Sequence, residues 1–288
     1  MDINLELYRV FYYVATTLSF SEASKLLFIS QSAVSQSVKT LEQKLNHTLF
    51  IRSTKKVSLT PEGELLLQHV TPALSLLSNG EALLAGDAGL SGQLRIAASD
   101  TICRYFLIKY LKRFHKEYPD VRIRIINSSS LGCVDLLENG QADLIVCNSP
   151  NSRLRSQKNI QVLREFEDIF VANPAYFPVT SEKLTPAQLL SYPILMLSPQ
   201  TTTSEYLRMN FASLGFKLMP EVELNSNDLL MDLAQIGLGI ACIPDYMFKK
   251  QKNLERVSLS APLAPRQMIL VHSDNLPQTA RQFMQYFS

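Results

Sequence analysis

One stretch, SFSEASKLLFISQSAVSQSVKTLEQKL at residues 19–45, limits more than any other what this chain can fold into. It contains two segments with helical periodicity that are separated by only a few residues. In the second segment, apolar residues recur at the spacing of one helix face: Val34, Val38, Leu41 and Leu45. Ser30 precedes that segment and is a suitable N-cap, so a helix beginning near Gln31 is predicted.

The first segment predicts a short helix over residues 21–28. Ser21 is the expected N-cap, and Ala23, Leu26 and Leu27 are expected to face inward. Only FIS separates this helix from the next, and two helices joined by so short a turn must cross steeply, as in a helix-turn-helix. A preceding helix, LELYRVFYYVATT, would close the core with Leu7, Val10, Phe11 and Val14.

The face of the second helix opposite its apolar stripe is polar but carries little charge. Its residues are Gln31, Ser32, Ser35, Gln36 and Lys39. Gln can bond adenine through two hydrogen bonds, Ser can bond either type of base, and Lys can reach guanine or a phosphate. A plain solvated helix face is the alternative, but such a face is usually richer in Glu and Lys. The pattern therefore favours a helix that reads DNA.

The residues after this helix predict a two-stranded wing. TLFI and VSL are strand-like and flank the basic tip RSTKK, which could contact backbone phosphates. The chain carries a formal charge of only +2, but seven basic and four acidic residues leave +3 within residues 1–60. This local excess favours a nucleic-acid-binding head. The expected DNA contacts outside the polar helix face are Ser21, Arg52, Thr54, Lys55 and Lys56.

These features resemble the winged helix-turn-helix of the LysR-type transcriptional regulators. SQSAVSQSVKTLEQKL followed by LFIR and LTPEG is a specific match, and the resemblance covers residues 1 to about 60. It implies an α + α/β fold with a winged helix-turn-helix head, a long linker helix and a two-lobed α/β domain similar to type-2 periplasmic binding proteins. It also implies a sequence-specific regulator of transcription that forms a homodimer or homotetramer. The implied partners are a pseudo-palindromic double-stranded DNA operator, a small-molecule effector and RNA polymerase.

The segment PEGELLLQHVTPALSLLSNGEALLAGDAG predicts the linker helix. Thr60 is a plausible cap and Pro61 suits the first helical position, whereas Pro72 should kink the helix or weaken one turn. The apolar stripe of this helix must be buried against its own domain or against a second chain, and the resemblance favours a dimer. The stripe consists of Leu66, Val70, Ala73, Leu74 and Leu77.

From Gly92 onward, strand-like and helix-like segments alternate, which is typical of an α/β domain with a mostly parallel sheet. The alternation restarts after Pro186 and predicts two lobes. The last strand, RQMILVH, and the last helix, PQTARQFMQYF, are expected to return to the first lobe. The expected boundaries are 1–59 for the head, 60–91 for the linker, 92–288 for the effector-binding domain, 92–163 with 267–288 for its first lobe, and 164–266 for its second lobe.

Polar residues cluster where the strands of both lobes are expected to end. Ligands of such sheets bind beyond the carboxyl ends of the strands, where helix N-termini offer free N–H groups. Helix capping is the alternative interpretation of any one of these residues, but four strand ends converge here. We therefore predict a cleft for a small polar or anionic effector such as a carboxylate, with Arg104 as the main cationic side chain nearby. The expected contacts are Ser99, Thr101, Ser128, Ser129, Ser130, Thr201, Thr202, Asn225 and Asn227.

An enzyme and a bound cofactor or metal are not expected. Neither HExxH nor GxSxG occurs, and the four histidines are scattered along the chain: His47, His69, His115 and His272. Apolar residues make up 46% of the chain and charged residues 19%, which is typical of a globular protein. No apolar run reaches the roughly 18 residues of a membrane span, and no export signal is visible, so a cytoplasmic protein is expected.

A thiol-based redox-sensing regulator is the second alternative. Cys103 and Cys133 fall in the first turns of expected helices, where a helix dipole lowers the pKa of a thiol. Against this alternative, most free cysteines are small buried hydrophobic residues. The peroxide-sensing branch of the family keeps its cysteine pair in the second lobe, whereas here that lobe contains only Cys242.

Overall fold

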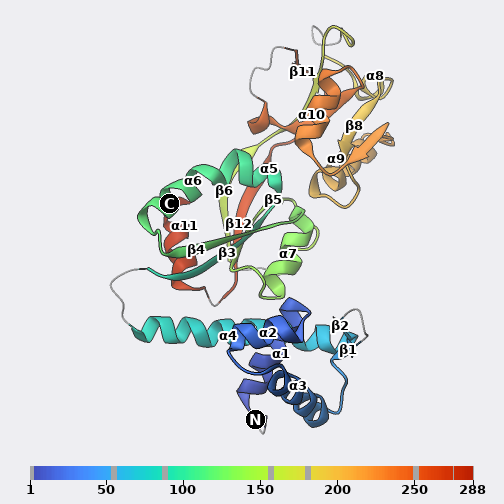
Figure 1. The fold of residues 1–288 in the computed structure, drawn as a ribbon. Coiled ribbons are helices and arrows are strands. Elements are labelled where there is room, and N and C mark those ends of the chain that lie inside the picture. The colour runs from blue at the N-terminus through green and yellow to red at the C-terminus, as the bar shows by residue number, and fades with distance from the viewer. Residues whose placement is uncertain are drawn as a thin grey trace. The chain divides into compact units, whose positions relative to one another are not determined.

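The computed structural model describes residues 3–52, 57–85, 90–154, 159–178, 183–248, 253–274 and 276–287. The chain divides into two compact units. The first comprises residues 1–87 with 139–141, and the second comprises residues 88–138 with 142–288. Each unit is built from its own helices and sheets, numbered in chain order, and Figure 1 labels most of them.

The described part of the first unit holds α1 (Leu5–Thr17), α2 (Phe20–Leu27), α3 (Gln31–Leu45), β1 (Phe50–Arg52), β2 (Val57–Leu59) and α4 (Pro61–Ala85). The helices α1, α2 and α3 enclose one apolar core in which Phe11 and Val38 are fully buried, so the predicted helix-turn-helix is confirmed. Ala23 and Leu27 face this core as predicted. Leu26 does not: it is 53% exposed, because adjacent helical residues point about 100° apart and Leu27 takes the inward position.

The N-cap of α3 agrees with the sequence prediction, whereas that of α2 does not. Ser30 caps α3 as predicted, since its hydroxyl accepts a hydrogen bond from the Ala33 N–H. The prediction that Ser21 caps α2 is wrong. Ser19 is the cap, its side chain accepts from the Glu22 N–H, and Ser21 lies exposed in the first turn.

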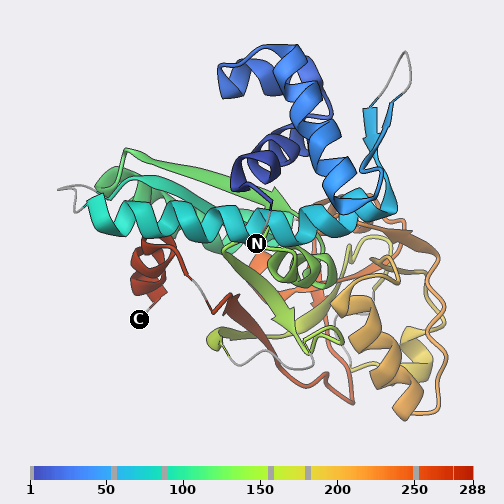
Figure 2. The same ribbon diagram turned by 90° about the horizontal axis from the view of Figure 1, so that it is seen from below.

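The wing and the linker helix come next along the chain after α3. β1 and β2 pair antiparallel, and α4 begins at Pro61 after its predicted cap, Thr60. The Thr60 hydroxyl accepts from the Gly63 N–H at 3.0 Å and donates to the Thr48 carbonyl at 2.7 Å, so it joins the start of α4 to the wing. Pro72 lies inside α4 without ending it, and Figure 2 shows α4 as one long helix.

The apolar stripe predicted on α4 is buried in part and exposed in part. Val70 is buried, and Leu66 and Leu74 pack against the core of α1, α2 and α3, so the alternative of packing within the same unit holds for these three residues. Other apolar side chains of the helix stay in contact with solvent. Within the stripe, Ala73 is exposed and Leu77 is 47% exposed. Outside it, Leu65 and Leu76 are 58% and 45% exposed.

The first lobe of the second unit is built around a five-stranded sheet of order β4-β3-β5-β12-β6. β3 is parallel to β4 and β5, whereas β12 is antiparallel to β5 and β6. The predicted return of the last strand and the last helix to this lobe is confirmed, because β12 lies inside the sheet and α11 packs on its core. The elements are β3 (Gly92–Ala98), α5 (Asp100–Ile102), a π-helix (Cys103–Leu107), α6 (Ile108–Glu117), β4 (Val121–Asn127), α7 (Ser130–Glu138), β5 (Leu144–Ser149), β6 (Ile160–Phe166), β12 (Arg266–His272), α11 (Gln278–Met284) and a 3-10 turn (Gln285–Phe287).

The second lobe is built around a five-stranded sheet of order β11-β7-β10-β8-β9. Its parallel strands β8, β9 and β10 were predicted, whereas β6, β7 and β11 were not. β6 stays in the first sheet as far as Phe166, beyond the boundary expected at residue 163. The elements are β7 (Asp168–Ala172), α8 (Pro186–Leu189), β8 (Ile194–Leu197), α9 (Thr202–Ser213), β9 (Val222–Leu224), α10 (Asn227–Gln235), β10 (Ile240–Pro244), a 3-10 turn (Asp245–Met247) and β11 (Glu255–Val257).

Two glycines of α4 give opposite predictions for stability. A Cβ atom on Gly63 would lie 2.2 Å from the Leu49 carbonyl oxygen, so the backbone must move, and we expect Gly63→Ala to cost about 1–3 kcal/mol. A Cβ atom on Gly80 would meet no described atom within 4 Å, and Gly80→Ala should stabilise the helix by about 0.4–1 kcal/mol. Thermal unfolding followed by circular dichroism checks both, and equal Tm values for the two variants would contradict this account.

Candidate functional site

The polar face of α3 is open to a partner. Gln31, Ser32, Gln36 and Lys39 are exposed, and Ser35 is partly exposed. The opposite face of the same helix carries the buried residues that hold it in the core. These polar side chains can therefore reach a partner without any loss of packing, which is the arrangement that readout in a DNA major groove requires.

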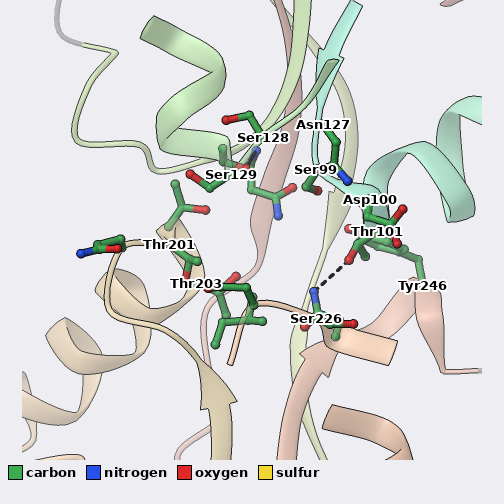
Figure 3. Close-up of a pocket in the computed structure, with 17 residues that line it drawn as sticks. Ser99, Asp100, Thr101, Asn127, Ser128, Ser129, Thr201, Thr203, Ser226 and Tyr246 are labelled. Atoms are coloured by element: carbon green, nitrogen blue, oxygen red, sulfur yellow. Dashed lines mark hydrogen bonds between the residues drawn. The ribbon is translucent and has the colours of Figure 1, made fainter. Parts of the chain in front are cut away.

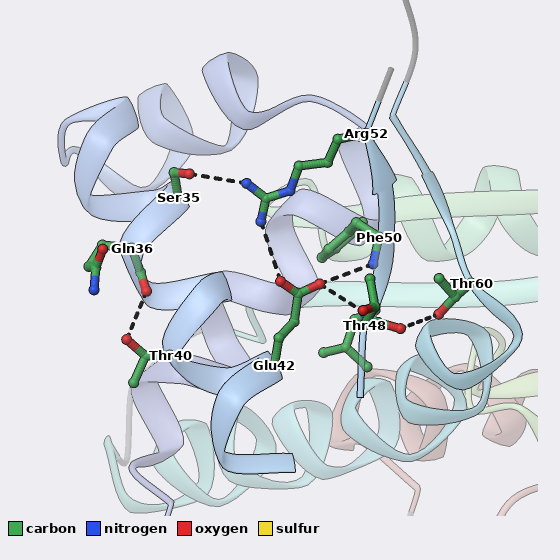
Figure 4. Close-up of polar contacts among 9 residues, drawn as sticks. Ser35, Gln36, Thr40, Glu42, Thr48, Phe50, Arg52 and Thr60 are labelled. Atoms are coloured by element: carbon green, nitrogen blue, oxygen red, sulfur yellow. Dashed lines mark hydrogen bonds and ion pairs between the residues drawn. The ribbon is translucent and has the colours of Figure 1, made fainter. Parts of the chain in front are cut away.

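Arg52, a predicted DNA contact, is held in place by three neighbours, two of which, Ser35 and Glu42, are seen in Figure 4. Its guanidinium donates to the Ser35 hydroxyl at 3.2 Å, lies 3.5 Å from a carboxylate oxygen of Glu42, and sits 4.6 Å from the centre of the Phe20 ring. The second oxygen of Glu42 accepts from the Leu49 N–H at 2.8 Å. The Arg52 side chain is still 41% exposed, so a positive charge is presented in a fixed position beside α3.

The remaining predicted DNA contacts are less well defined by the structure. Ser21 is exposed on α2, whereas Thr54, Lys55 and Lys56 lie outside the described residues.

A shallow hollow of about 540 Å³ runs between α3 and the wing. Its lining consists of Phe20, Gln31, Ser32, Ser35, Arg52 and Val57. The contribution of Phe20 was not predicted, because its contact with Arg52 joins residues far apart in the sequence.

A cavity of about 590 Å³ lies in the second unit, where the ends of strands from both lobes meet (Figure 3). All nine residues predicted to contact an effector line it, so the structure brings them together. Eight further residues complete the lining: Asp100, Asn127, Asn148, Leu197, Gln200, Thr203, Ser226 and Tyr246. The sequence analysis missed the region of Asn148 and Tyr246 altogether, although Asn148 ends the predicted strand ADLIVCN and could have been found by the same rule.

Several of the cavity hydroxyls also cap helices. Ser99 and Thr201 accept hydrogen bonds from N–H groups in the first turns of α5 and α9. Ser226 does the same at α10, and Ser129 accepts from the Gly132 N–H in α7. The capping alternative is thus correct for these four side chains, but each cap satisfies only part of its helix end. The other first-turn N–H groups of the helices have no partner within the helix.

Polar contacts join the two lobes along one side of the cavity. The Asn227 amide donates to the Thr101 hydroxyl at 3.0 Å, and both residues are buried. The Tyr105 hydroxyl donates to Asp228, and burial together with this bond raises the pKa of Tyr105 to about 12. Arg104 lies 3.4 Å from the same carboxylate and is not part of the cavity lining. Arg104, the main candidate for a side-chain cation near these residues, therefore contacts Asp228 across the lobes and does not line the cavity.

The cysteines have properties that oppose a redox function. Burial, assisted by the nearby Asp100 carboxylate, raises the pKa of the Cys103 thiol to about 11. Burial likewise raises the pKa of Cys133 above its ordinary value. Both pKa values are raised, with burial as the largest cause, which is opposite to the lowering that the redox alternative would need. Neither residue is part of the cavity lining.

Among the described residues, the His, Cys, Asp and Glu side chains form no group of three or more that could hold a metal ion. In the same part of the chain, no helix is long and apolar enough to span a membrane.

Comparison with protein families gives two matches that together cover nearly the whole chain. Residues 5–64 match the bacterial regulatory helix-turn-helix protein of the lysR family, and residues 87–288 match the LysR substrate binding domain. Among curated proteins, the chain is 27% identical over 264 residues to the HTH-type transcriptional activator CmpR of Synechocystis sp.. That alignment covers 91% of this chain and 84% of CmpR.

Solved structures share the fold over the whole length. A full-length OxyR variant from Pseudomonas aeruginosa superposes with a TM-score of 0.78 at 20% identity, covering 99% of this chain and 95% of OxyR. CbnR in complex with its target DNA superposes with a TM-score of 0.66 at 16% identity, covering 99% of both chains. At these identities the similarity shows the common architecture of a winged head and a two-lobed α/β domain.

The pKa values of the thiols predict slow alkylation. Because a thiol reacts as its thiolate, Cys103 with a pKa near 11 should be almost fully protonated at neutral pH. We expect iodoacetamide to modify Cys103 and Cys133 far more slowly than it modifies free glutathione at neutral pH. The rate at Cys103 should rise as the pH approaches 11. Peptide mass spectrometry measures the modified fraction, and modification of either residue as fast as glutathione would contradict the raised pKa.

Proposed function

Because this chain belongs to the LysR family of transcriptional regulators, we propose that it reads its DNA site through the polar face of α3 and that a small molecule in the cavity of the second unit controls it. The first part rests on one observation above the others: α3 exposes base-bonding side chains next to the fixed guanidinium of Arg52. The Gln and Ser side chains supply hydrogen bonds to base edges, and Arg52 with Lys39 supplies contacts to phosphate or guanine.

The proposed effector is a small carboxylate or other polar metabolite. The cavity is lined mainly by hydroxyl and amide groups from both lobes, which supports a ligand that contacts both at once. Such a ligand binds one arrangement of the lobes better than another, and only that difference in affinity can shift a conformational equilibrium. The raised pKa values of the cysteines weigh against redox control as an alternative.

We further propose that the chain acts as a dimer or a tetramer joined through α4, with the head at residues 1–59, the linker at 60–91 and the effector-binding domain at 92–288. The exposed Leu65, Leu76 and Leu77 support this, because an apolar helix face gains stability when a second chain covers it. Two heads related by a two-fold axis would bind half-sites about 34–36 Å apart, or a multiple of that distance. We also propose that the protein contacts RNA polymerase, acts in the cytoplasm and catalyses no reaction.

Direct readout predicts that Gln36→Ala weakens binding to the specific DNA site by about 1–3 kcal/mol and leaves binding to scrambled DNA almost unchanged. The physical reason is that a base contact contributes only where the correct base is present. Fluorescence anisotropy with both DNAs at two salt concentrations measures this.

Gln43→Ala is the matched control, because Gln43 is exposed on α3 about two turns nearer its C-terminus, away from the end that enters a groove. It should affect both DNAs slightly and equally. Equal losses on specific and scrambled DNA for Gln36→Ala would remove Gln36 from the base contacts.

The oligomer proposal predicts that Leu77→Glu lowers the fraction of dimer, since it places a charge within a seam that dimerisation would bury. Ser78→Glu adds the same charge at an exposed polar position of α4 that points away from the three leucines, and it should leave the dimer intact. Sedimentation velocity at micromolar protein concentration distinguishes the two. An unchanged dimer fraction for Leu77→Glu would mean that this face of α4 is not the main interface.

A further inference from the structure

A smaller cavity of about 210 Å³ lies in the second lobe beside the start of β7. It shares no lining residue with the cavity proposed for the effector. Since liquid water takes up about 30 Å³ per molecule, the space corresponds to about seven waters and has room for a small organic molecule. The function proposed above makes no use of this smaller cavity.

The smaller cavity lies where β7 and β11 separate. The two strands are paired as far as Val257, which lies opposite Phe170. Beyond Val257 the chain turns from β7 toward Leu184. The Leu184 N–H donates to the Ser258 carbonyl at 2.9 Å, and the Leu184 carbonyl accepts from the Ser260 N–H at 2.8 Å. The ladder between the two strands therefore opens, and residues from both sides of the opening line the cavity.

The backbone of Asp168 points into this opening. The Asp245 N–H donates to the Glu167 carbonyl at 2.8 Å, so the backbone groups of Glu167 point toward the side of β10. Consecutive residues of an antiparallel strand direct their backbone groups to opposite neighbours, so those of Asp168 point away from β10 and toward the cavity. Pro244 is the residue opposite Asp168 on β10, and it has no N–H to donate.

The backbone of Leu259 faces the opening from the other side. The Ser258 carbonyl and the Ser260 N–H both point to Leu184, so by the same alternation the N–H and the carbonyl of Leu259 point back toward β7. The register of β7 and β11 would place Leu259 opposite Asp168, but in the described part of the chain no backbone hydrogen bond joins them. Two donors and two acceptors thus face the cavity, and backbone groups of this kind require partners.

The side chains around the smaller cavity leave one positive charge uncompensated. Arg256 is paired with Glu167 at 2.7 Å. Lys183 also lines the cavity, is exposed, and forms no ion pair with any residue that the structure describes. The carboxylate of Asp168 does not add a negative charge, because it is fully buried and paired with Arg266. A ligand with a single negative charge suits this balance.

We propose that the smaller cavity is a second ligand site, which binds a molecule with one amide group and one carboxylate, such as an N-acylated amino acid. The amide N–H and carbonyl bond to the free backbone groups of Asp168 and Leu259, in the way that an added strand bonds to the edge of a sheet. The carboxylate pairs with Lys183. This site is separate from the effector cavity, so the proposal does not rest on the effector function.

A ligand in this site contacts the residue that joins the second lobe to the first. The backbone of Asp168 faces the smaller cavity, and its side chain accepts from Arg266 at 2.7 Å. Arg266 also donates to the hydroxyl of Thr203, which lines the effector cavity. The two cavities are therefore connected through one buried ion pair.

The experiment measures binding of N-acetylglycine, N-acetylalanine and N-acetylleucine to the full-length protein by calorimetry. We expect at least one of them to bind with a Kd of about 1 mM or lower. Its keto isostere, in which a CH2 group replaces the amide N–H, should bind about tenfold more weakly, because a backbone carbonyl then lacks its donor. For N-acetylglycine this isostere is 4-oxopentanoate. The uncharged N-acetyl amino acid amide should bind about threefold more weakly or worse.

Hydrogen exchange followed by mass spectrometry locates the bound molecule. The N–H groups of Asp168 and Leu259 gain an acceptor only when the ligand is present. Binding should therefore slow exchange in peptides that contain residues 167–170 and 258–260. Peptides that contain residues 127–131, which belong to the effector cavity and α7, should exchange at an unchanged rate.

Two variants of Lys183 test the charge. Lys183→Gln should weaken the best N-acetyl amino acid about threefold or more, whereas Lys183→Arg, which keeps the charge, should stay within about twofold. Lys217→Gln is the matched control, because Lys217 is an exposed lysine of the same lobe that does not line the smaller cavity. It should bind like the wild type, and all three variants should keep the wild-type Tm because their side chains are exposed.

Four results would each overturn the proposal. They are equal affinity for the amide and its keto isostere, full affinity in Lys183→Gln, slowed exchange confined to the effector cavity, and no binding of any N-acetyl amino acid. The DNA-binding measurements with Gln36→Ala use no ligand, so none of these results bears on the regulatory function.

Discussion

The buried ion pair between Arg266 and Asp168 is the interaction on which the architecture of the second unit depends. The two residues stand at the two points where the chain passes from one sheet to the other, and no water reaches either side chain. Burial raises the pKa of Asp168, and the neighbouring Arg266 opposes that rise. Loss of one partner would leave the other charge uncompensated, at a cost of about 3–5 kcal/mol. The pair therefore stabilises the junction at which the chain passes between the two sheets.

In the first unit, Glu42 connects two elements, much as the pair of Arg266 and Asp168 does in the second unit. One of its oxygens accepts from the backbone at Leu49 and the other pairs with Arg52, so a single carboxylate connects α3 to the first strand of the wing. The same carboxylate lowers the cost of holding the Arg52 guanidinium in one place, because the side chain needs no further ordering when a partner arrives. The wing and the helix face are thus presented to a partner as one surface.

Much of the fold could be predicted from the sequence, because local periodicity determines helices and alternating elements determine an α/β sheet. Some errors are local, such as the cap of α2, which is Ser19 and not Ser21. Others depend on neighbours that are distant in sequence. Leu26 and Leu27 both suit a core, and only packing against α1 decides between them. A cysteine in a first turn suggests a lowered pKa, but the burial that raises the pKa of Cys103 comes from elements that the local pattern does not contain.

The candidate site also combines residues that local sequence reveals with residues that only the folded chain brings together. The nine predicted cavity residues lie just after strand ends or in the first turns of the helices that follow, a feature that is local and therefore visible in sequence. Arg266 lies 63 residues from Thr203 and 98 from Asp168, and no pattern in the chain joins them. The β6 and β7 strands were missed for a related reason, since only Glu167 separates them and the charged run REFED interrupts their apolar pattern.

Hydroxyl groups at helix starts have two uses in this protein, and the hydrogen-bond partners distinguish them. Ser99, Thr201 and Ser226 accept from the helix that follows them, so their oxygens are engaged whether or not a ligand is present. Thr203 lies one step inside its helix, where its oxygen accepts from a buried side chain instead. A cap stabilises its own helix alone, whereas Thr203 joins a helix start, a cavity and the crossing between two lobes. Composition does not separate these roles, since all four are Ser or Thr, but their hydrogen-bond partners do.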